Sequence, residues 1–186
     1  MDEKSSTKDQ IITTLKKTGA LQFGDFTLAS GAKSKYYIDL RILPNYPREF
    51  EILVDIAIDY IKQNITEIEG IVAIPLAAIP FGTLLAYKLN KPFYILRKDP
   101  KKHGLKKMIE GELKPGQKIL LVDDLISSGF SKVFAIDALR NEGAYVKNLF
   151  VFIDRTPDGL TEFEKEQSIK VHYLLNAKDL LAQVKE

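Results

Sequence analysis

The chain has 186 residues, which is enough for one domain with a sizeable hydrophobic core. Its 27 basic and 25 acidic residues give a net charge of +2, so no global attraction to nucleic acid or membrane is expected and any electropositive site must be local. Cysteine is absent and only two histidines are present, which excludes disulfides and thiolate metal sites and leaves little material for a zinc centre.

No targeting or membrane-spanning segment is expected from the sequence. The first ten residues, "MDEKSSTKDQ", are polar and contain no apolar signal core. No apolar run approaches the roughly 18 residues of a membrane span. We therefore expect a cytoplasmic enzyme or binding protein.

Alternating strands and helices are predicted along most of the chain. Residues 24–47 and 97–116 are the longest stretches without a clear pattern, and we expect both to be functional loops. Helices are predicted at 47–63, 81–89 and 131–142, with a last amphipathic turn or two at 177–184. Strands are predicted at 68–76, 91–96, 117–125, 146–154 and 170–175.

This order of elements predicts an α/β fold. Continuous apolar strands that alternate with helices are typical of a central parallel β-sheet flanked by helices on both faces. Ligands bind beyond the carboxyl ends of the strands in such sheets. The regions of interest therefore begin at Pro75, Arg97, Asp123 and Asp154.

The stretch "ILLVDDLISSGFSK", residues 119–132, carries the most informative motif. An apolar strand ends on Asp123 and Asp124, and a loop with glycine and serines then leads into a helix. The N–H groups and dipole of a helix N-terminus suit a phosphate, and the serines add hydroxyl donors. Carboxylates beside a phosphate must face something else, and sugar hydroxyls or a Mg²⁺ ion fit. The motif therefore describes a ribose 5-phosphate, with the phosphate in the loop and the diol on the aspartates.

Other interpretations of this motif fit less well. The nearest approach to a nucleotide-binding P-loop, "GELKPGQK" at 111–118, has its lysine one place late and precedes a strand, so we reject it. A dinucleotide-binding G-x-G-x-x-G pattern is absent. A structural cap, with Ser131 as N-cap, would explain the serine and one aspartate but not the second.

The same stretch resembles the phosphoribosyl-diphosphate (PRPP) binding motif of type I phosphoribosyltransferases, and the match runs from Ile119 to Ser131.

A second motif, "RKDPKKHG" at 97–104, is a solvated basic loop or a nucleic-acid patch in the simplest interpretation. It has no interleaved aromatic residues to stack on bases, and a diphosphate leaving group suits it better. Its pattern resembles the flexible catalytic loop of orotate phosphoribosyltransferases.

Three further segments are similar to the same family and occur in its order. They are "GDFTLASGAKSKYYIDLR" at 24–41, "IPLAAIPFGT" at 74–83 and "FIDRTPDG" at 152–159. The resemblance implies one phosphoribosyltransferase domain over 1–186, with a small hood formed mainly by residues 1–45 and the C-terminal segment. It also implies a homodimer whose subunits share active sites, with no nucleic-acid or membrane partner.

The resemblance implies roles for individual residues. PRPP would be bound by Arg97, Lys98, Lys101, His103, Asp123, Asp124, Leu125, Ile126, Ser127, Ser128, Gly129, Phe130 and Ser131. Orotate would be bound by Ser127, Arg155, Tyr36 and Tyr37, and the catalytic residues would be Lys98, Lys101, His103 and Asp124. Mg²⁺ would be bound through PRPP, with no certain protein ligand.

Two departures from the family and two alternative functions accompany these expectations. Many relatives have lysine where this chain has Ala29, and some have it at Ala77; Lys33 is near enough in sequence to replace the first of these lysines.

A purine-base phosphoribosyltransferase would share the aspartate motif but would not need Arg155 for a carboxylate. A noncatalytic PRPP- or purine-sensing regulator would need a DNA-binding module, and only about 20 residues precede "GDFTLASG".

Overall fold

The computed structural model describes residues 3–27, 31–97, 108–127, 129–156 and 158–184. Several residues with expected roles lie outside these ranges: Ala29, Lys98, Lys101, His103 and Ser128.

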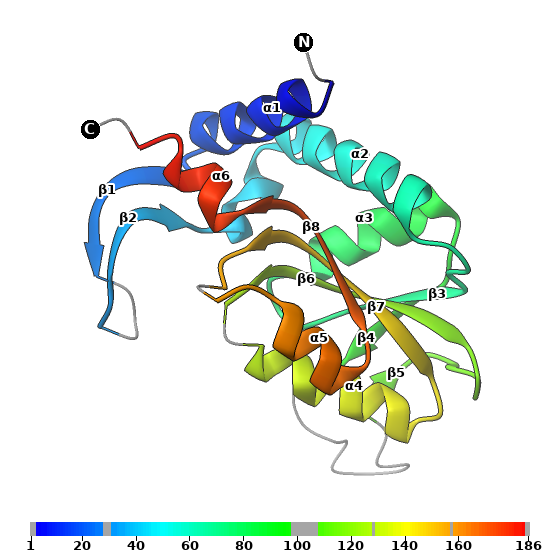
Figure 1. Ribbon diagram of the computed structural model, residues 1–186. Helices are drawn as coiled ribbons and strands as arrows, with labels where there is room; N and C mark the ends of the chain where they lie inside the picture. The colour runs from blue at the N-terminus through cyan, green and yellow to red at the C-terminus, as the bar shows by residue number, and fades with distance from the viewer. Residues whose placement is uncertain (1–2, 28–30, 98–107, 128, 157, 185–186) are drawn as a thin grey trace.

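A six-stranded sheet forms the centre of the described chain, with strand order β5-β4-β3-β6-β7-β8 (Figure 1). The strands are β3 (Gly70–Ala73), β4 (Phe93–Leu96), β5 (Ile109–Glu110), β6 (Lys118–Ile126), β7 (Tyr145–Asp154) and β8 (Lys170–Asn176). All neighbouring pairs are parallel except β4 and β5. Because β3, β6 and β7 are buried over most of their length, their sequences are continuous apolar runs. The α/β prediction is confirmed.

Helices cover both faces of this sheet (Figure 1). On one side lie α1 (Glu3–Lys17), α2 (Pro47–Asn64) and α3 (Ile79–Leu89); on the other lie α4 (Phe130–Asn141) and α5 (Thr161–Gln167). Helix α2 begins with Pro47 in its first turn and buries the stripe Phe50, Leu53, Val54, Ala57, Ile58 and Ile61.

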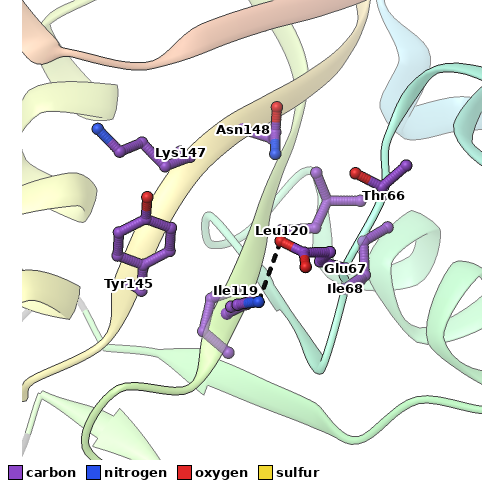
Figure 2. Close-up of a pocket in the computed structure, with 9 residues that line it drawn as sticks. Thr66, Glu67, Ile68, Ile119, Leu120, Tyr145, Lys147 and Asn148 are labelled. Atoms are coloured by element: carbon purple, nitrogen blue, oxygen red, sulfur yellow. Dashed lines mark ion pairs between the residues drawn. The ribbon is translucent and has the colours of Figure 1, made fainter.

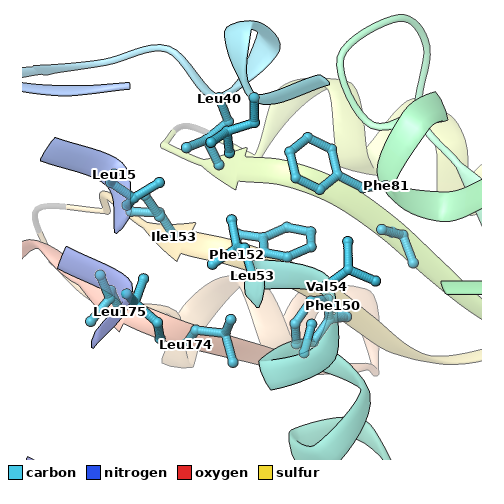
Figure 3. Close-up of a cluster of buried hydrophobic side chains, with 14 of the residues drawn as sticks. Leu15, Leu40, Leu53, Val54, Phe81, Phe150, Phe152, Ile153, Leu174 and Leu175 are labelled. Carbon is cyan, nitrogen blue, oxygen red and sulfur yellow. The ribbon is translucent and has the colours of Figure 1, made fainter. Parts of the chain in front are cut away.

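The core between these helices and the sheet is rich in aromatic rings (Figure 3). Phe81 of α3 lies 4.5 Å from Phe152 of β7 and 4.9 Å from Phe50 of α2, measured between ring centroids. A separate core on the other face packs β6 and β7 against α4. The two cores together fix the sheet, and therefore the edge at which its strands end.

The stretch 24–47 is more regular than we predicted. It contains most of a hairpin, β1 (Leu21–Thr27) and β2 (Lys33–Ile38), followed by the 3-10 helix η1 (Leu40–Asn45). The pattern was missed because both strands are largely exposed and polar, so alternation of apolar residues is weak. The stretch 97–116 likewise contains the two-residue edge strand β5.

The N- and C-terminal elements meet beside the hairpin. The short helix α6 (Ala177–Leu181) lies next to β2, and Lys8 of α1 pairs with Asp179 of α6 at 2.7 Å. Figure 1 shows the hairpin and α6 beside the edge of the sheet where β6, β7 and β8 end. Helices α1 and α5 were not predicted, because α1 buries few apolar side chains and α5 buries none. No helix in the described part of the chain is long and apolar enough to span a membrane.

Candidate active site

Four parallel strands end at one edge of the sheet. Strand β3 leads into Pro75, β4 into Arg97, β6 contains Asp123 and Asp124 near its end, and β7 leads into Arg155. The register pairs Ala73 of β3 with Val122, so β3 ends beside the aspartates, and it pairs Ile126 with Asp154, so β6 and β7 end level with each other. The four predicted regions thus follow four consecutive strands of the sheet, β4, β3, β6 and β7. Arg97 lies two strands from β6, about 10 Å away.

A cavity of about 290 Å³ opens at this edge. Its lining comes from η1 and the residue before it, the loop after β3, the end of β6 and the start of α4: Ile38, Asp39, Arg41, Ile74, Pro75, Ala77, Asp123, Asp124, Leu125, Ser131 and Lys132. Five of these side chains are charged, which is unusual for a concave surface and indicates a polar ligand.

The two aspartates have different environments. Asp123 is buried, its Oδ2 lies 2.6 Å from Nζ of Lys132, and its Oδ1 accepts a hydrogen bond from the Asp124 N–H at 2.9 Å. Asp124 is partly exposed and accepts from the Leu125 N–H at 2.8 Å. Burial, followed by the neighbouring charge of Asp123, raises the pKa of Asp124 to about 7. Because Asp123 is held by Lys132, Asp124 is the carboxylate whose lone pairs remain available to a ligand.

The loop after β6 presents backbone N–H groups at the start of α4. Gly129 has φ +74°, and a side chain there would meet the Phe163 ring at 2.7 Å, so glycine is required for two reasons. Gly129 is the N-cap and no side chain caps the helix, so the interpretation of Ser131 as N-cap was wrong. Ser131 lines the cavity instead, while Ser127 and Phe130 are exposed at the loop surface. The uncapped N–H groups suit an anion such as phosphate.

Arg155 is positioned by its own backbone and by its neighbours. Its N–H donates to the Ile126 carbonyl at 2.8 Å, and Asp154 accepts two hydrogen bonds from Thr156, which fix the turn. The guanidinium lies 5.5 Å from the centroid of the Tyr36 ring. Its Nε is buried and finds no hydrogen-bond partner among the described residues. A buried unpaired donor on a cation is costly, which indicates that an anionic ligand completes this position.

The other predicted residues take up separate positions. Tyr37 is half exposed on β2, pairs with Phe26 at 5.7 Å between centroids, and faces away from Tyr36 along the strand. Arg97 forms an ion pair with Glu110 at 2.7 Å. Lys33 donates to the Thr27 hydroxyl across the hairpin, away from the cavity lining.

Sequence reasoning missed three charged residues of the cavity. Arg41 holds Asp39 through two hydrogen bonds of 2.7 and 2.8 Å, which lower the pKa of Asp39, and this pair forms the wall opposite the aspartates. Lys132 is buried in α4, within the stripe formed by Ala135, Ile136 and Leu139. A lysine at an apolar stripe position was the signal that could have identified it.

A second cavity, of about 170 Å³, lies at the opposite edge, where β6 and β7 begin (Figure 2). Its charged groups already contact other residues: Lys118 pairs with Glu67 at 3.0 Å, and Lys147 lies over the Tyr145 ring at 5.6 Å. It is also at the amino ends of the strands, away from the loops that carry function in parallel sheets. We therefore place the candidate active site at the carboxyl edge.

Comparison with known proteins identifies the family of this chain. Residues 43–169 match the family model described as "Phosphoribosyl transferase domain". The orotate phosphoribosyltransferase of Methanocaldococcus jannaschii is 35% identical over 180 residues, which cover 97% of this chain and 98% of that protein. The chain belongs to the orotate phosphoribosyltransferase family.

Solved structures extend the likeness to the fold. Orotate phosphoribosyltransferase from Aeropyrum pernix superposes with a TM-score of 0.81 at 28% identity, covering 93% of this chain and 97% of that one. UMP synthase of Leishmania donovani also superposes with a TM-score of 0.81, at 30% identity. The match covers 96% of this chain but only 38% of the synthase. The family architecture therefore applies to nearly the whole chain.

Proposed function

We propose that the protein transfers the 5-phosphoribosyl group of PRPP to N1 of orotate, giving orotidine 5'-monophosphate and diphosphate in de novo UMP synthesis. This is a pentosyltransferase reaction. The bond between ribose C1 and the diphosphate breaks, and a new C1–N bond forms to orotate. Negative charge grows on the diphosphate while the ribose ring gains oxocarbenium character.

The observation that carries this proposal is the buried Nε of Arg155, which has no hydrogen-bond partner among the described residues and belongs to the residue hydrogen-bonded to the end of β6. A carboxylate accepts two parallel hydrogen bonds from guanidinium, and orotate is a base that bears a carboxylate. Tyr36 packs against the same guanidinium and would lie next to the bound base, together with Ser127. In this proposal Tyr37 contributes at the outer side of β2.

The phosphoribosyl half of the site follows from the cavity and the loop after β6. The ribose hydroxyls bind Asp123 and Asp124, and the 5-phosphate binds the loop from Leu125 to Ser131 through backbone N–H groups and hydroxyls. The carboxylate of Asp124 is on the sugar side, where its negative charge suits the oxocarbenium character of the ring. Ile126 acts through its backbone, because its side chain is buried in the core and its carbonyl accepts from Arg155.

The diphosphate would be bound by the cationic segment after β4. Arg97, Lys98, Lys101 and His103 are assigned to it, with His103 a candidate acid toward the leaving group. Mg²⁺, when bound, neutralises charge on diphosphate and ribose oxygens. Among the described residues no group of three acidic, histidine or cysteine side chains could hold a metal ion.

We also propose that the protein works as a cytoplasmic homodimer, with Lys101 and His103 reaching the active site of the neighbouring subunit. Two large apolar side chains are strongly exposed, Leu76 in the loop after β3 at 72% and Tyr87 near the end of α3 at 81%. Exposed apolar groups of this size favour a protein contact. No nucleic-acid or membrane partner is part of the proposal.

The test is a substrate panel. The purified protein is incubated with PRPP and Mg²⁺ and with orotate, adenine, guanine, xanthine or uracil, and release of diphosphate is followed. We expect consumption with orotate alone. Consumption of a purine would replace this proposal by the purine-base alternative, in which Arg155 has no carboxylate to bind, and no consumption of any base would favour a noncatalytic role.

A further inference from the structure

Lys132 occupies a position that is unfavourable for a lysine. It lies in the first turn of α4, and its side chain is only 8% exposed. Lysine is almost never buried unless paired, because its charge must leave water. A cation in the first turn of a helix also opposes the helix dipole. Two unfavourable terms at one residue require a compensating interaction.

Asp123 and Ser131 provide that interaction. The Lys132 ammonium lies 2.6 Å from Asp123 Oδ2 and donates to the Ser131 hydroxyl at 3.2 Å. Asp123 belongs to the end of β6 and Ser131 to the loop–helix junction, so one ammonium connects the two parts of the cavity.

The other charged groups that line the cavity do not take the place of Lys132 as the partner of Asp123. Arg41 and Asp39, from the wall formed at η1, are paired with each other. Asp124 is a carboxylate next to Asp123 and cannot neutralise it. Among the charged side chains that line the cavity, Lys132 is therefore the cation matched to Asp123.

We propose that Lys132 is a positioning residue for phosphoribosyl transfer, which holds the Asp123 carboxylate and the Ser131 hydroxyl in the arrangement that receives the phosphoribosyl group. This inference rests on the proposed function. Without the ammonium, Asp123 is a buried carboxylate without its cation beside Asp124, and two uncompensated negative charges face an anionic substrate. The orotate end, built on Arg155 and Tyr36, contains none of these contacts.

The predicted effect is therefore specific to one substrate. In Lys132→Met, which keeps the length of the side chain without its charge, we expect the KM for PRPP to rise roughly 10- to 100-fold. The KM for orotate should change less than about twofold. Lys132→Arg keeps the charge and should recover most of the PRPP affinity.

A matched control comes from the opposite edge of the sheet. Lys118 also pairs with a carboxylate, that of Glu67, but at the cavity in Figure 2. Lys118→Met should leave both KM values unchanged. The double variant Asp123→Asn with Lys132→Met should bind PRPP no worse than Asp123→Asn alone, since the two residues act as one unit.

Steady-state kinetics with each substrate varied, together with thermal unfolding of each variant, test the proposal. If Lys132→Met does not fold, Lys132→Gln takes its place with the same expected increase. An unchanged KM for PRPP in a folded variant, equal increases for both substrates, or no recovery by arginine would overturn it. A wild-type protein that does not consume orotate contradicts the proposed function itself, and that outcome is seen before any variant is measured.

Discussion

The two ends of strand β6 carry charged residues in opposite conditions. At its amino end Lys118 is paired with the Glu67 carboxylate near the surface. At its carboxyl end Asp124 is partly buried beside a second carboxylate. At the end of the neighbouring strand β7, Arg155 has a buried donor with no partner in the described part of the chain. Both edges have a cavity, and among the described residues the carboxyl edge combines two adjacent carboxylates with a buried guanidinium nitrogen that has no hydrogen-bond partner.

This difference distinguishes a binding site from a surface cavity that binds no ligand. A charged group that already has its partner gains little from a ligand, whereas an uncompensated one is stabilised by it. Uncompensated charged groups at the carboxyl edge lower the stability of the folded protein. The core formed by Phe81, Phe150 and Phe152 is rigid enough to keep these groups in place.

The largest effect is expected at Arg155. Arg155→Ala should lower kcat/KM for orotate by roughly 10²- to 10³-fold, because a bidentate partner of a buried carboxylate is worth about 3–4 kcal/mol. The KM for PRPP should stay close to that of the wild type. Initial-rate measurements over a matrix of both substrates give these values, and a loss shared equally between the substrates would contradict an orotate-specific role.

Asp124→Asn should separate activity from stability. We expect kcat to fall about 100-fold, because the charge on the sugar side is lost. The folded-state pKa of Asp124, about 7, lies above its ordinary value of 3.8, so the wild type loses stability as pH rises through that window. The asparagine variant should therefore be more stable than the wild type by roughly 2 kcal/mol at pH 8 and about equal to it near pH 4. Urea unfolding of both proteins at pH 8 and pH 4 measures this difference in stability. An equal difference at the two pH values would show that the pKa of Asp124 is not raised in the folded state.

The sequence predicted the edge of the sheet but not all of the site. Asp123, Asp124 and Arg155 follow apolar strands, and strand order alone places such ends together. Lys132 was not assigned, although it lies at an apolar stripe position, because a lysine in a helix is normally solvated and only the packing of α4 on the sheet turns its side chain toward Asp123. Asp39 and Arg41 escaped notice because their position depends on the hairpin, whose exposed strands carry little apolar pattern.

His172 offers a test of stability without a change in the site. It is buried in β8, with Nε2 3.0 Å from Asn148 Oδ1 and Nδ1 3.5 Å from the Tyr60 hydroxyl. Burial lowers the pKa of His172 to about 4, below its ordinary 6.5. The neutral ring is thus favoured in the folded state, and stability present above pH 6.5 is lost as pH falls toward 4. Between pH 7.5 and 4.5 we expect a loss of about 2–3 kcal/mol that His172→Gln does not show. Urea unfolding of both proteins at each pH measures it, and parallel curves would remove His172 as the cause.

The smallest effect is expected at the amino edge. Lys118→Ala removes the partner of Glu67, and an ion pair of this exposure contributes at most about 1 kcal/mol, commonly less. Glu67 has φ +61°, a conformation unfavourable for its side chain, so Glu67→Gly should offset the lost pair and leave stability within about 0.5 kcal/mol of the wild type. Kinetic constants for both substrates should be unchanged in either variant. A fall in activity here would mean that this edge also takes part in function, and the contrast between the two ends of β6 would no longer identify the site.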